Sequence, residues 1–128
     1  MFCIRCGTPM RHKVLNGVLL DHCRNCRGIW VDGGEIGKLT TATIASYVHL
    51  KAQAKREDDQ TKKNTDFCKS VCQRCQAILQ VVTERGVQLE RCPECKGAFF
   101  DYQELDKILE QRSKLDKFLD WMTGIFGG

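Results

Sequence analysis

The chain has 128 residues, nine of them cysteines, and a formal net charge of +4, with 42% hydrophobic residues. It has no apolar run of about eighteen residues, which argues against a membrane-spanning helix. The opening residues, Met1 to Cys6, lack the charged leader and apolar stretch of a secretory signal. We therefore expect a cytoplasmic protein whose cysteines are reduced rather than paired in disulfides.

Eight of the nine cysteines form four pairs, each with two residues between its members. The pairs fall in two identical layouts, with sixteen residues between the pairs: Cys3/Cys6 with Cys23/Cys26, and Cys72/Cys75 with Cys92/Cys95. Two such pairs brought together offer the closed shell of four sulfurs that structural zinc prefers. The layout predicts two Zn²⁺ sites, with iron in a rubredoxin-like site or a redox-labile zinc as alternatives. A closed shell leaves no position for water, so hydrolytic catalysis at the metal is not expected.

The duplication extends beyond the cysteines. Residues 3–39 align with 72–108 without a gap and share 12 identities in 37 positions, of which only four are cysteines. Shared positions outside the metal ligands include Arg5/Arg74, Gly28/Gly97, Asp32/Asp101 and Glu35/Glu104. The repeat is therefore a structural unit and not only a metal-binding motif.

Between its cysteine pairs, the first repeat has the pattern of a β-hairpin. Residues 10–15 and 18–22 flank Asn16-Gly17, a dipeptide suited to the positive φ angles of a two-residue turn. The second repeat has the same plan, with strands expected over 78–84 and 87–91 and a slightly different turn at Arg85-Gly86.

A capping-box pattern follows the last cysteine of each repeat. An aspartate precedes a glutamate by three residues, at Asp32 and Glu35 and again at Asp101 and Glu104. In a capping box the aspartate accepts hydrogen bonds from the first helical N–H groups and the glutamate reaches back. We expect one helix from near Gly33 to about Leu50, followed by a charged connector over residues 51–66.

The second helix has a clearer apolar stripe. Its apolar positions alternate in steps of three and four, as in a coiled-coil seam, with Arg112 as the polar interruption: Leu105, Ile108, Leu115, Leu119, Met122 and Phe126. The stripe predicts either packing on the chain's own first helix or ribbon, or a seam for a protein partner or a second copy.

Neither repeat is large enough to fold on a hydrophobic core alone, so a metal must stabilise it. We expect a small α+β fold of two metal-stapled zinc ribbons, each a β-hairpin with a four-cysteine zinc site followed by an α-helix. The boundaries are residues 1–50 for the first ribbon and its helix, 51–66 for the connector, and 67–128 for the second ribbon and its long amphipathic C-terminal helix.

Both halves resemble the transcription factor IIB-type zinc-finger family of small bacterial zinc ribbons, whose members often occur in tandem. The resemblance assigns Cys3, Cys6, Cys23 and Cys26 to one zinc and Cys72, Cys75, Cys92 and Cys95 to the other. It also marks Gly28, Trp30, Asp32 and Glu35 as a ribbon-to-helix signature. The chain departs from the family pattern in its first knuckles, which lack a proline that Pro93 keeps. The family name implies a link to transcription.

Two further residues near the cysteines carry separate expectations. Cys68, four residues before Cys72, is interpreted as a spare thiol, although a helix there would bring it toward the second site. His22 precedes Cys23 and could compete as a metal ligand or donate to a sulfur, but its counterpart in the second repeat is Arg91, which suggests a surface position.

Two functions compete, ahead of a third class, a redox enzyme or chaperone that uses its cysteines reversibly. Eight thiolates outweigh two Zn²⁺ ions by four negative charges, which brings the loaded protein close to neutral. We therefore expect a non-enzymatic module that docks a protein partner or a second copy through its C-terminal helix and acts on transcription or other nucleic-acid machinery. The alternative is direct DNA or RNA binding by the N-terminal ribbon, with Trp30 stacked on a base and phosphate contacts from Arg5, Arg11, Lys13, Arg24 and Arg27. The sequence has no pattern of a nucleophile with its base, a phosphate loop or a paired-carboxylate site.

Overall fold

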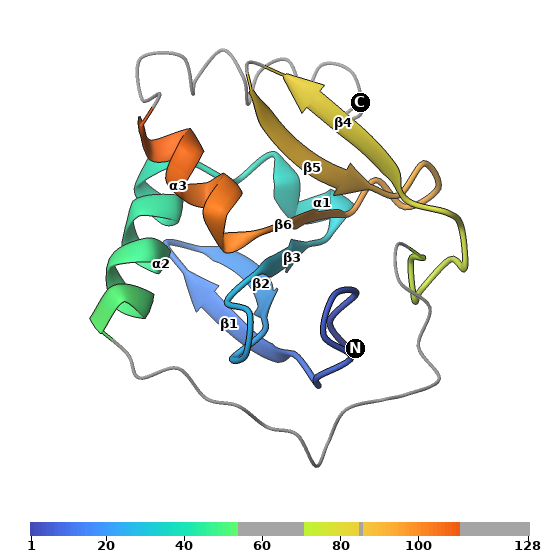
Figure 1. Cartoon of the computed structure of the whole chain (residues 1–128), viewed down its shortest axis with the longest axis horizontal. Coiled ribbons are helices and arrows are strands. Elements are labelled where there is room, and N and C mark those ends of the chain that lie inside the picture. Colours follow the sequence, from blue (N-terminus) through green and yellow to red (C-terminus); the bar gives the residue numbers. More distant parts are fainter. Residues whose placement is uncertain (54–70, 85, 111–128) are drawn as a thin grey trace.

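A single six-stranded antiparallel sheet runs through both repeats in the computed structural model (Figure 1). The structure describes residues 1–53, 71–84 and 86–110. The strand order is β1-β2-β3-β6-β5-β4, so each repeat contributes three consecutive strands. The strands are β1 (Arg11–Leu15), β2 (Val18–His22), β3 (Ile29–Val31), β4 (Gln80–Glu84), β5 (Val87–Arg91) and β6 (Ala98–Phe100).

The two predicted hairpins are present. In the first, β1 pairs with β2 across a turn in which Asn16 has φ 51° and Gly17 has φ 80°, the left-handed geometry that an Asn-Gly turn adopts. In the second, β4 pairs with β5, and Gly86 has φ 82°. Residue 85, the other turn position, lies outside the described residues.

The pairing of β3 with β6 joins the repeats and follows a two-fold pattern. Its register is Ile29 with Phe100, Trp30 with Phe99, and Val31 with Ala98. In the alignment of the repeats, Trp30 corresponds to Phe99, so equivalent residues face each other at the centre. The two ribbons are thus fixed to each other by a shared sheet, related by an approximate two-fold axis between β3 and β6.

The two faces of the central strands pack in different cores. On one face Ile29, Val31 and Phe100 join a core that also holds apolar residues of the helices. On the other face Trp30 and Phe99 pack among the cysteines of both metal clusters. Because both faces are covered, these strands consist entirely of buried residues, unlike the alternating outer strands.

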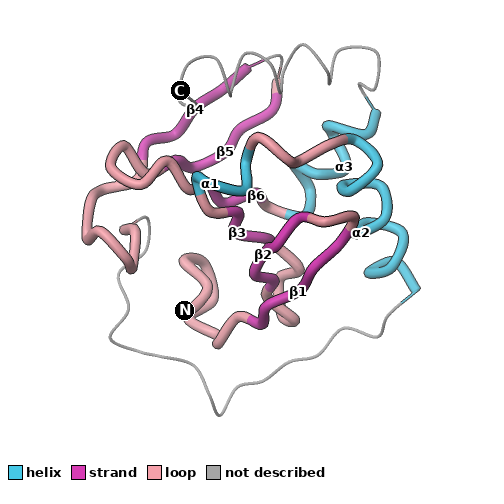
Figure 2. Tube along the Cα trace, turned by 180° about the vertical axis from the view of Figure 1, so that it is seen from behind, coloured by secondary structure: helices cyan, strands magenta, loops and turns pink. Residues whose placement is uncertain are grey.

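The helices are α1 (Gly33–Ile36), α2 (Thr41–Gln53) and α3 (Tyr102–Glu110). Figure 2 shows α2 and α3 side by side, and the Tyr102 hydroxyl of α3 donates to the Val48 carbonyl of α2 at 3.2 Å. The expectation of one helix from Gly33 to Leu50 was wrong. The chain leaves the helix after Ile36, and a second helix starts where the Thr40 side chain accepts from the Thr43 N–H at 3.3 Å. Within the described residues, no helix is both long and apolar enough to cross a bilayer.

The capping-box prediction was also wrong for Asp32 and for both glutamates. At the start of α1, the Asp32 side chain makes no capping hydrogen bond and accepts instead from the Trp30 indole N–H at 2.9 Å. Both glutamates bind a strand of their own repeat. Glu35 Oε2 accepts from the Leu19 N–H at 3.3 Å, and Glu104 Oε2 accepts from the Gln88 N–H at 2.9 Å. These shared acidic residues therefore tie each helix start to its hairpin.

Candidate metal centres and the seam between the repeats

All four cysteine pairs form the same backbone knuckle. In each, the residue after the second cysteine has a positive φ and donates its N–H to the carbonyl of the first cysteine. The turn is tight enough to face two sulfurs toward one point. The four residues are Gly7 (φ 71°), Arg27 (67°), Gln76 (62°) and Lys96 (67°).

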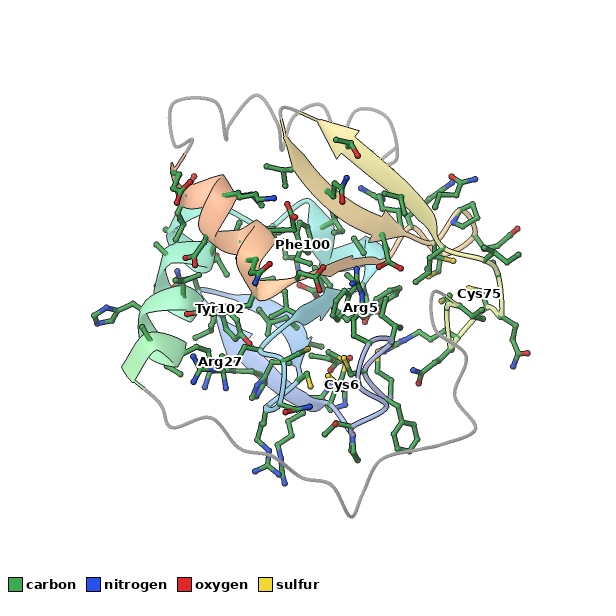
Figure 3. The ribbon with its side chains drawn as sticks, in the orientation of Figure 1. Arg5, Cys6, Arg27, Cys75, Phe100 and Tyr102 are labelled. Atoms are coloured by element: carbon green, nitrogen blue, oxygen red, sulfur yellow. The ribbon has the colours of Figure 1, made fainter. Side chains whose placement is uncertain are left out.

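The knuckles bring the predicted ligands together in two groups, as Figure 3 shows for the sulfur atoms around Cys6 and Cys75. Within each group all four sulfurs lie within 4.8 Å of one another. The Cys3 and Cys26 sulfurs are 3.6 Å apart, and the Cys72 and Cys95 sulfurs are 3.8 Å apart. A tetrahedral zinc with bonds of about 2.3 Å places its sulfurs about 3.8 Å apart. The sulfur positions therefore fit one zinc ion per group.

The backbone stabilises negative charge on these sulfurs. The Cys3 sulfur accepts from the Arg5 N–H, Cys23 from the Cys26 N–H, and Cys26 from the Gly28 N–H, each at 3.4 Å. Such bonds favour the thiolate, the form that binds metal. In the second group, the Cys92 sulfur accepts from the Cys95 N–H at 3.4 Å.

Hydrogen bonds between the thiols of a group shift their pKa values in opposite directions. Hydrogen bonds from Cys26 and Cys3 lower the pKa of the Cys23 thiol to about 2. The hydrogen bond with Cys23 raises the pKa of Cys3 to about 12, and burial raises the pKa of Cys95 to about 12. A divalent cation that replaces the protons of these thiols allows the sulfurs of a group to bind it as thiolates.

The two groups differ in their exposure to solvent. Cys3, Cys23, Cys72 and Cys92 are buried, and Cys6, Cys26 and Cys95 are partly buried. Cys75 alone among these eight is exposed, although its counterpart Cys6 packs against the core. The second group is therefore the more accessible of the two.

Reciprocal ion pairs cross the seam between the repeats. Arg5 pairs with Glu90, and it also pairs with Asp101 at 3.0 Å. The mirror set uses Arg74, which pairs with Asp32 at 3.4 Å and lies 3.9 Å from Asp21. The identities at Arg5/Arg74 and Asp32/Asp101 are explained by this seam, because each arginine binds the other repeat's aspartate.

Reciprocal close packing also crosses the seam and explains two shared glycines. A Cβ atom added to Gly28 would lie 2.5 Å from Phe99 Cζ. A Cβ added to Gly97 would lie 2.9 Å from Trp30 Cε2, and nearer still to Cζ2. Each aromatic ring therefore sits directly on the glycine of the other repeat. Because Trp30 is fully buried, it offers no ring for stacking on a base.

The five side chains expected to contact nucleic acid are divided among different places, although Arg5 and Arg27 line one cavity. Arg5 belongs to the seam, and Arg27 lies over the Tyr102 ring at 5.7 Å from its centroid. Arg11 is exposed on the edge strand β1. Lys13 and Arg24 lie near His22, where burial and the positive charges of Lys51, Lys13 and Arg24 lower the pKa of the imidazole to about 4.

The expected surface position of His22 was wrong, because both His22 and Arg91 are buried. The His22 ring packs edge-on to Tyr47 of α2 at a centroid distance of 6.3 Å. The Arg91 guanidinium donates to the Lys96 carbonyl in the last knuckle at 2.9 Å. Both side chains therefore belong to the interior of the protein and not to its surface.

The apolar stripe of the C-terminal helix enters the chain's own core where the structure describes it. Leu105 and Ile108 are buried in the core that also contains Ile44 and Tyr47 of α2. These two residues are therefore not available to a partner. The remaining positions of the apolar stripe lie outside the described residues, as does Cys68: Leu115, Leu119, Met122 and Phe126.

Sequence reasoning missed the residues that complete the seam. Glu90 and Asp21 sit on inner strands and receive the arginines of the other repeat. A signal was present in the sequence, since both repeats keep an acidic residue two positions before the third cysteine.

A family model described as transcription factor zinc-finger, of the TFIIB zinc-ribbon type, matches residues 3–42 and again 71–111. The two matched segments cover well over half of the chain, and each contains one complete group of four cysteines. No curated protein and no solved structure matches the chain significantly.

Proposed function

We propose, from the premise that this chain belongs to the transcription factor zinc-finger family, that it is a non-enzymatic adaptor. It binds two zinc ions and uses the rigid body they stabilise to dock a protein partner. Through that partner it acts on transcription or other nucleic-acid machinery. Both repeats have the same fold and the same kind of metal site, whereas docking uses surfaces in which the repeats differ.

The observation that carries this proposal is the internal use of the shared residues. The arginine, aspartate, glycine and glutamate positions common to both repeats bind within the chain, across the seam or at the helix starts. They hold two ribbons in one sheet and leave no shared residue pattern pointing at a reactive centre among the described residues. Four sulfurs also complete each metal shell, which supports a structural role for zinc.

The exposed surface favours a protein partner over nucleic acid. Among the described residues, the exposed large apolar side chains are all aliphatic, with Val14, Ile78 and Val81 at 65%, 76% and 66% exposure. Proteins that bind single strands without sequence preference generally use exposed aromatic rings for stacking. Arg5, the first basic residue of the N-terminal ribbon, forms ion pairs with Glu90 and Asp101 within the chain. The near-neutral charge of the zinc-loaded chain gives little general attraction for phosphate.

The test uses the zinc-loaded full chain as bait in an extract of its native host, with and without nuclease. We expect a protein to be retained at a fixed ratio to the bait after nuclease treatment. The double variant Leu115→Asp, Leu119→Asp should lose this retained protein, because the spacing of the apolar residues in the sequence places both on the apolar stripe. A matched control, Lys114→Asp with Lys117→Asp, changes charge off the stripe and should retain it.

Two results would contradict the proposal. One is retention that disappears with nuclease, which would assign direct nucleic-acid binding. The other is an absence of any retained protein together with a monomeric mass in solution, which would leave no docking partner of either kind.

A further inference from the structure

A cavity of about 490 Å³ lies where the second knuckle of the first repeat faces the start of α3. Figure 3 shows Arg27 and Tyr102 together at this place. The lining residues are Arg5, Asn25, Cys26 and Arg27 from the first repeat and Asp101, Tyr102 and Gln103 from the second. The volume is within the range of about 300 to 1,000 Å³ typical of ligand sites.

The cavity belongs to one side of the pseudo-symmetric molecule. Its two-fold counterpart lies between the last knuckle and the start of α1, where Gly33 occupies the position of Tyr102. A Cβ added to Gly33 would collide with the Cys95 carbonyl oxygen and lie 3.0 Å from Lys96 Cβ. Gly33 thus lets the backbones touch on that side, whereas the Tyr102 side chain keeps them apart on the other. The opening is a difference between the repeats and not part of their common fold.

The groups around the cavity favour a negatively charged ligand. Arg27 lies over the Tyr102 ring, which orients its planar guanidinium beside the opening. Asn25 stands where the second repeat has Glu94, so one carboxylate is missing on this side. Helix α3 begins at the cavity, where the Leu105 N–H donates to the Asp101 carbonyl at 3.0 Å. In the first turn of a helix, the N–H groups have no carbonyl partner within the helix, so they favour a negatively charged group.

The wider charge distribution attracts anions to the same side. With −2 counted for each zinc-bound four-cysteine group, residues 1–53 carry a net +2 (seven Lys and Arg, three Asp and Glu) and residues 71–110 a net −4 (five and seven). An acidic segment is therefore drawn toward the first repeat, within the screening distance of about 10 Å at ordinary salt.

Negative charges at the rim limit how much charge the ligand carries. Asp101 lies in the lining, and Cys26 belongs to a four-cysteine group that carries a charge of −2 with zinc bound. A dianionic phosphate meets twice the repulsion that a singly charged carboxylate meets. A carboxylate also matches the two parallel N–H groups of a guanidinium, and the amides of Asn25 and Gln103 suit the peptide groups around it.

We propose that this cavity binds an aspartate or glutamate side chain in an acidic segment of the partner protein. The proposal rests on the function proposed above and assigns its point of recognition. Arg27 provides the paired contact, and Tyr102 holds both the guanidinium and the opening in place.

The test follows backbone amide shifts of the ¹⁵N-labelled, zinc-loaded full chain. The probe is a blocked peptide, Gly-Glu-Asp-Glu-Gly, with its isosteric Gly-Gln-Asn-Gln-Gly form as control and with acetate and inorganic phosphate at matched ionic strength. We expect the acidic peptide to shift Asn25, Arg27, Tyr102 and Gln103 while the counterparts Glu94 and Lys96 stay in place. Acetate should shift the same amides at higher concentration, and phosphate should not.

Arg27→Gln should weaken peptide binding about tenfold or more, because a charge-assisted pair is lost. The substitution suits the backbone, since Gln76 occupies the same knuckle position at φ 62°. Lys96→Gln is the matched control on the two-fold-related side and should bind as the wild type does. Both variants should retain two zinc ions and otherwise unchanged spectra.

The proposal is overturned if Arg27→Gln binds the peptide unchanged, if the shifts map elsewhere, or if phosphate binds these amides more tightly than the peptide. As bait in the extract, Arg27→Gln separates the two proposals. Undiminished capture of the partner by this variant would refute the cavity as docking point and leave the proposed function standing. Failure of the wild type to capture any protein, together with a monomeric mass in solution, would refute the proposed function itself.

Discussion

Replacing Gly97 with alanine tests the packing that joins the two ribbons. The added Cβ would lie 2.9 Å from Trp30 Cε2 and closer to Cζ2, whereas carbon atoms in contact are about 3.5 to 4.0 Å apart. Trp30 is fully buried, so its ring has no open space to enter, and moving it disturbs the indole bond to Asp32. Overpacking costs about 1 to 3 kcal/mol and the lost hydrogen bond about 1 kcal/mol, so we expect a loss of about 2 to 4 kcal/mol.

Urea unfolding followed by circular dichroism at saturating zinc measures this loss. Gly34→Ala is the matched control, because a Cβ there meets nothing within 4 Å, and we expect its stability to be unchanged or slightly raised. In a Trp30→Leu background the Gly97→Ala penalty should shrink by about 1 kcal/mol or more, since the two residues are in contact. Equal stability of Gly97→Ala and Gly34→Ala, or full additivity with Trp30→Leu, would refute the packing across the seam.

Three further outcomes follow from the described contacts. Tyr47→Phe should lower the free energy of unfolding by about 1 kcal/mol, measured in urea, because the hydroxyl donates to the Arg27 carbonyl at 2.8 Å; an unchanged value would contradict this. A chelator should remove zinc from the second group first, because Cys75 is exposed. If an alkylating reagent is present, mass spectrometry should then find alkylation at Cys75 before any cysteine of the first group, and the reverse order would contradict this. Cys92→Ser should disturb both repeats, because β3 and β6 share one sheet and one core. Native amide shifts throughout the first repeat of this variant would instead show the ribbons to be independent.

The local units of this fold could be predicted because each has a short-range cause. The C-x2-C spacing specifies a knuckle and its sulfurs, and Asn16-Gly17 specifies a hairpin turn through its left-handed backbone. The duplication then predicts the second unit from the first. For this reason the fold class, the metal ligands and the hairpin strands could be predicted from the sequence.

The contacts between the units could not be predicted, because no local pattern separates them from local alternatives. Asp32 and Glu35 have the spacing of a capping box, yet Asp32 binds Trp30 and Arg74, and Glu35 binds β2. The three-residue apolar run of β3 does not reveal which strand will pair with it. Shared arginine and glycine positions in the two repeats were visible as identities, but their partners depend on the two-fold arrangement.

The same comparison separates residues that build the fold from residues that distinguish the repeats. Gly33 and Tyr102 occupy equivalent positions, and one closes the gap beside a knuckle while the other keeps it open. In a duplicated protein, such unlike pairs are the places where a function can differ from the common scaffold. The Arg27 and Tyr102 cavity is the clearest case among the described residues.

We expect zinc bound by four sulfurs to stabilise each ribbon of the continuous sheet. Metal analysis and X-ray absorption on gently purified full chain should find two zinc ions per chain, each with four sulfur neighbours at about 2.3 Å. A folded chain with fewer than two metal ions, with nitrogen or oxygen ligands in place of sulfur, or with these cysteines joined as disulfides would contradict it.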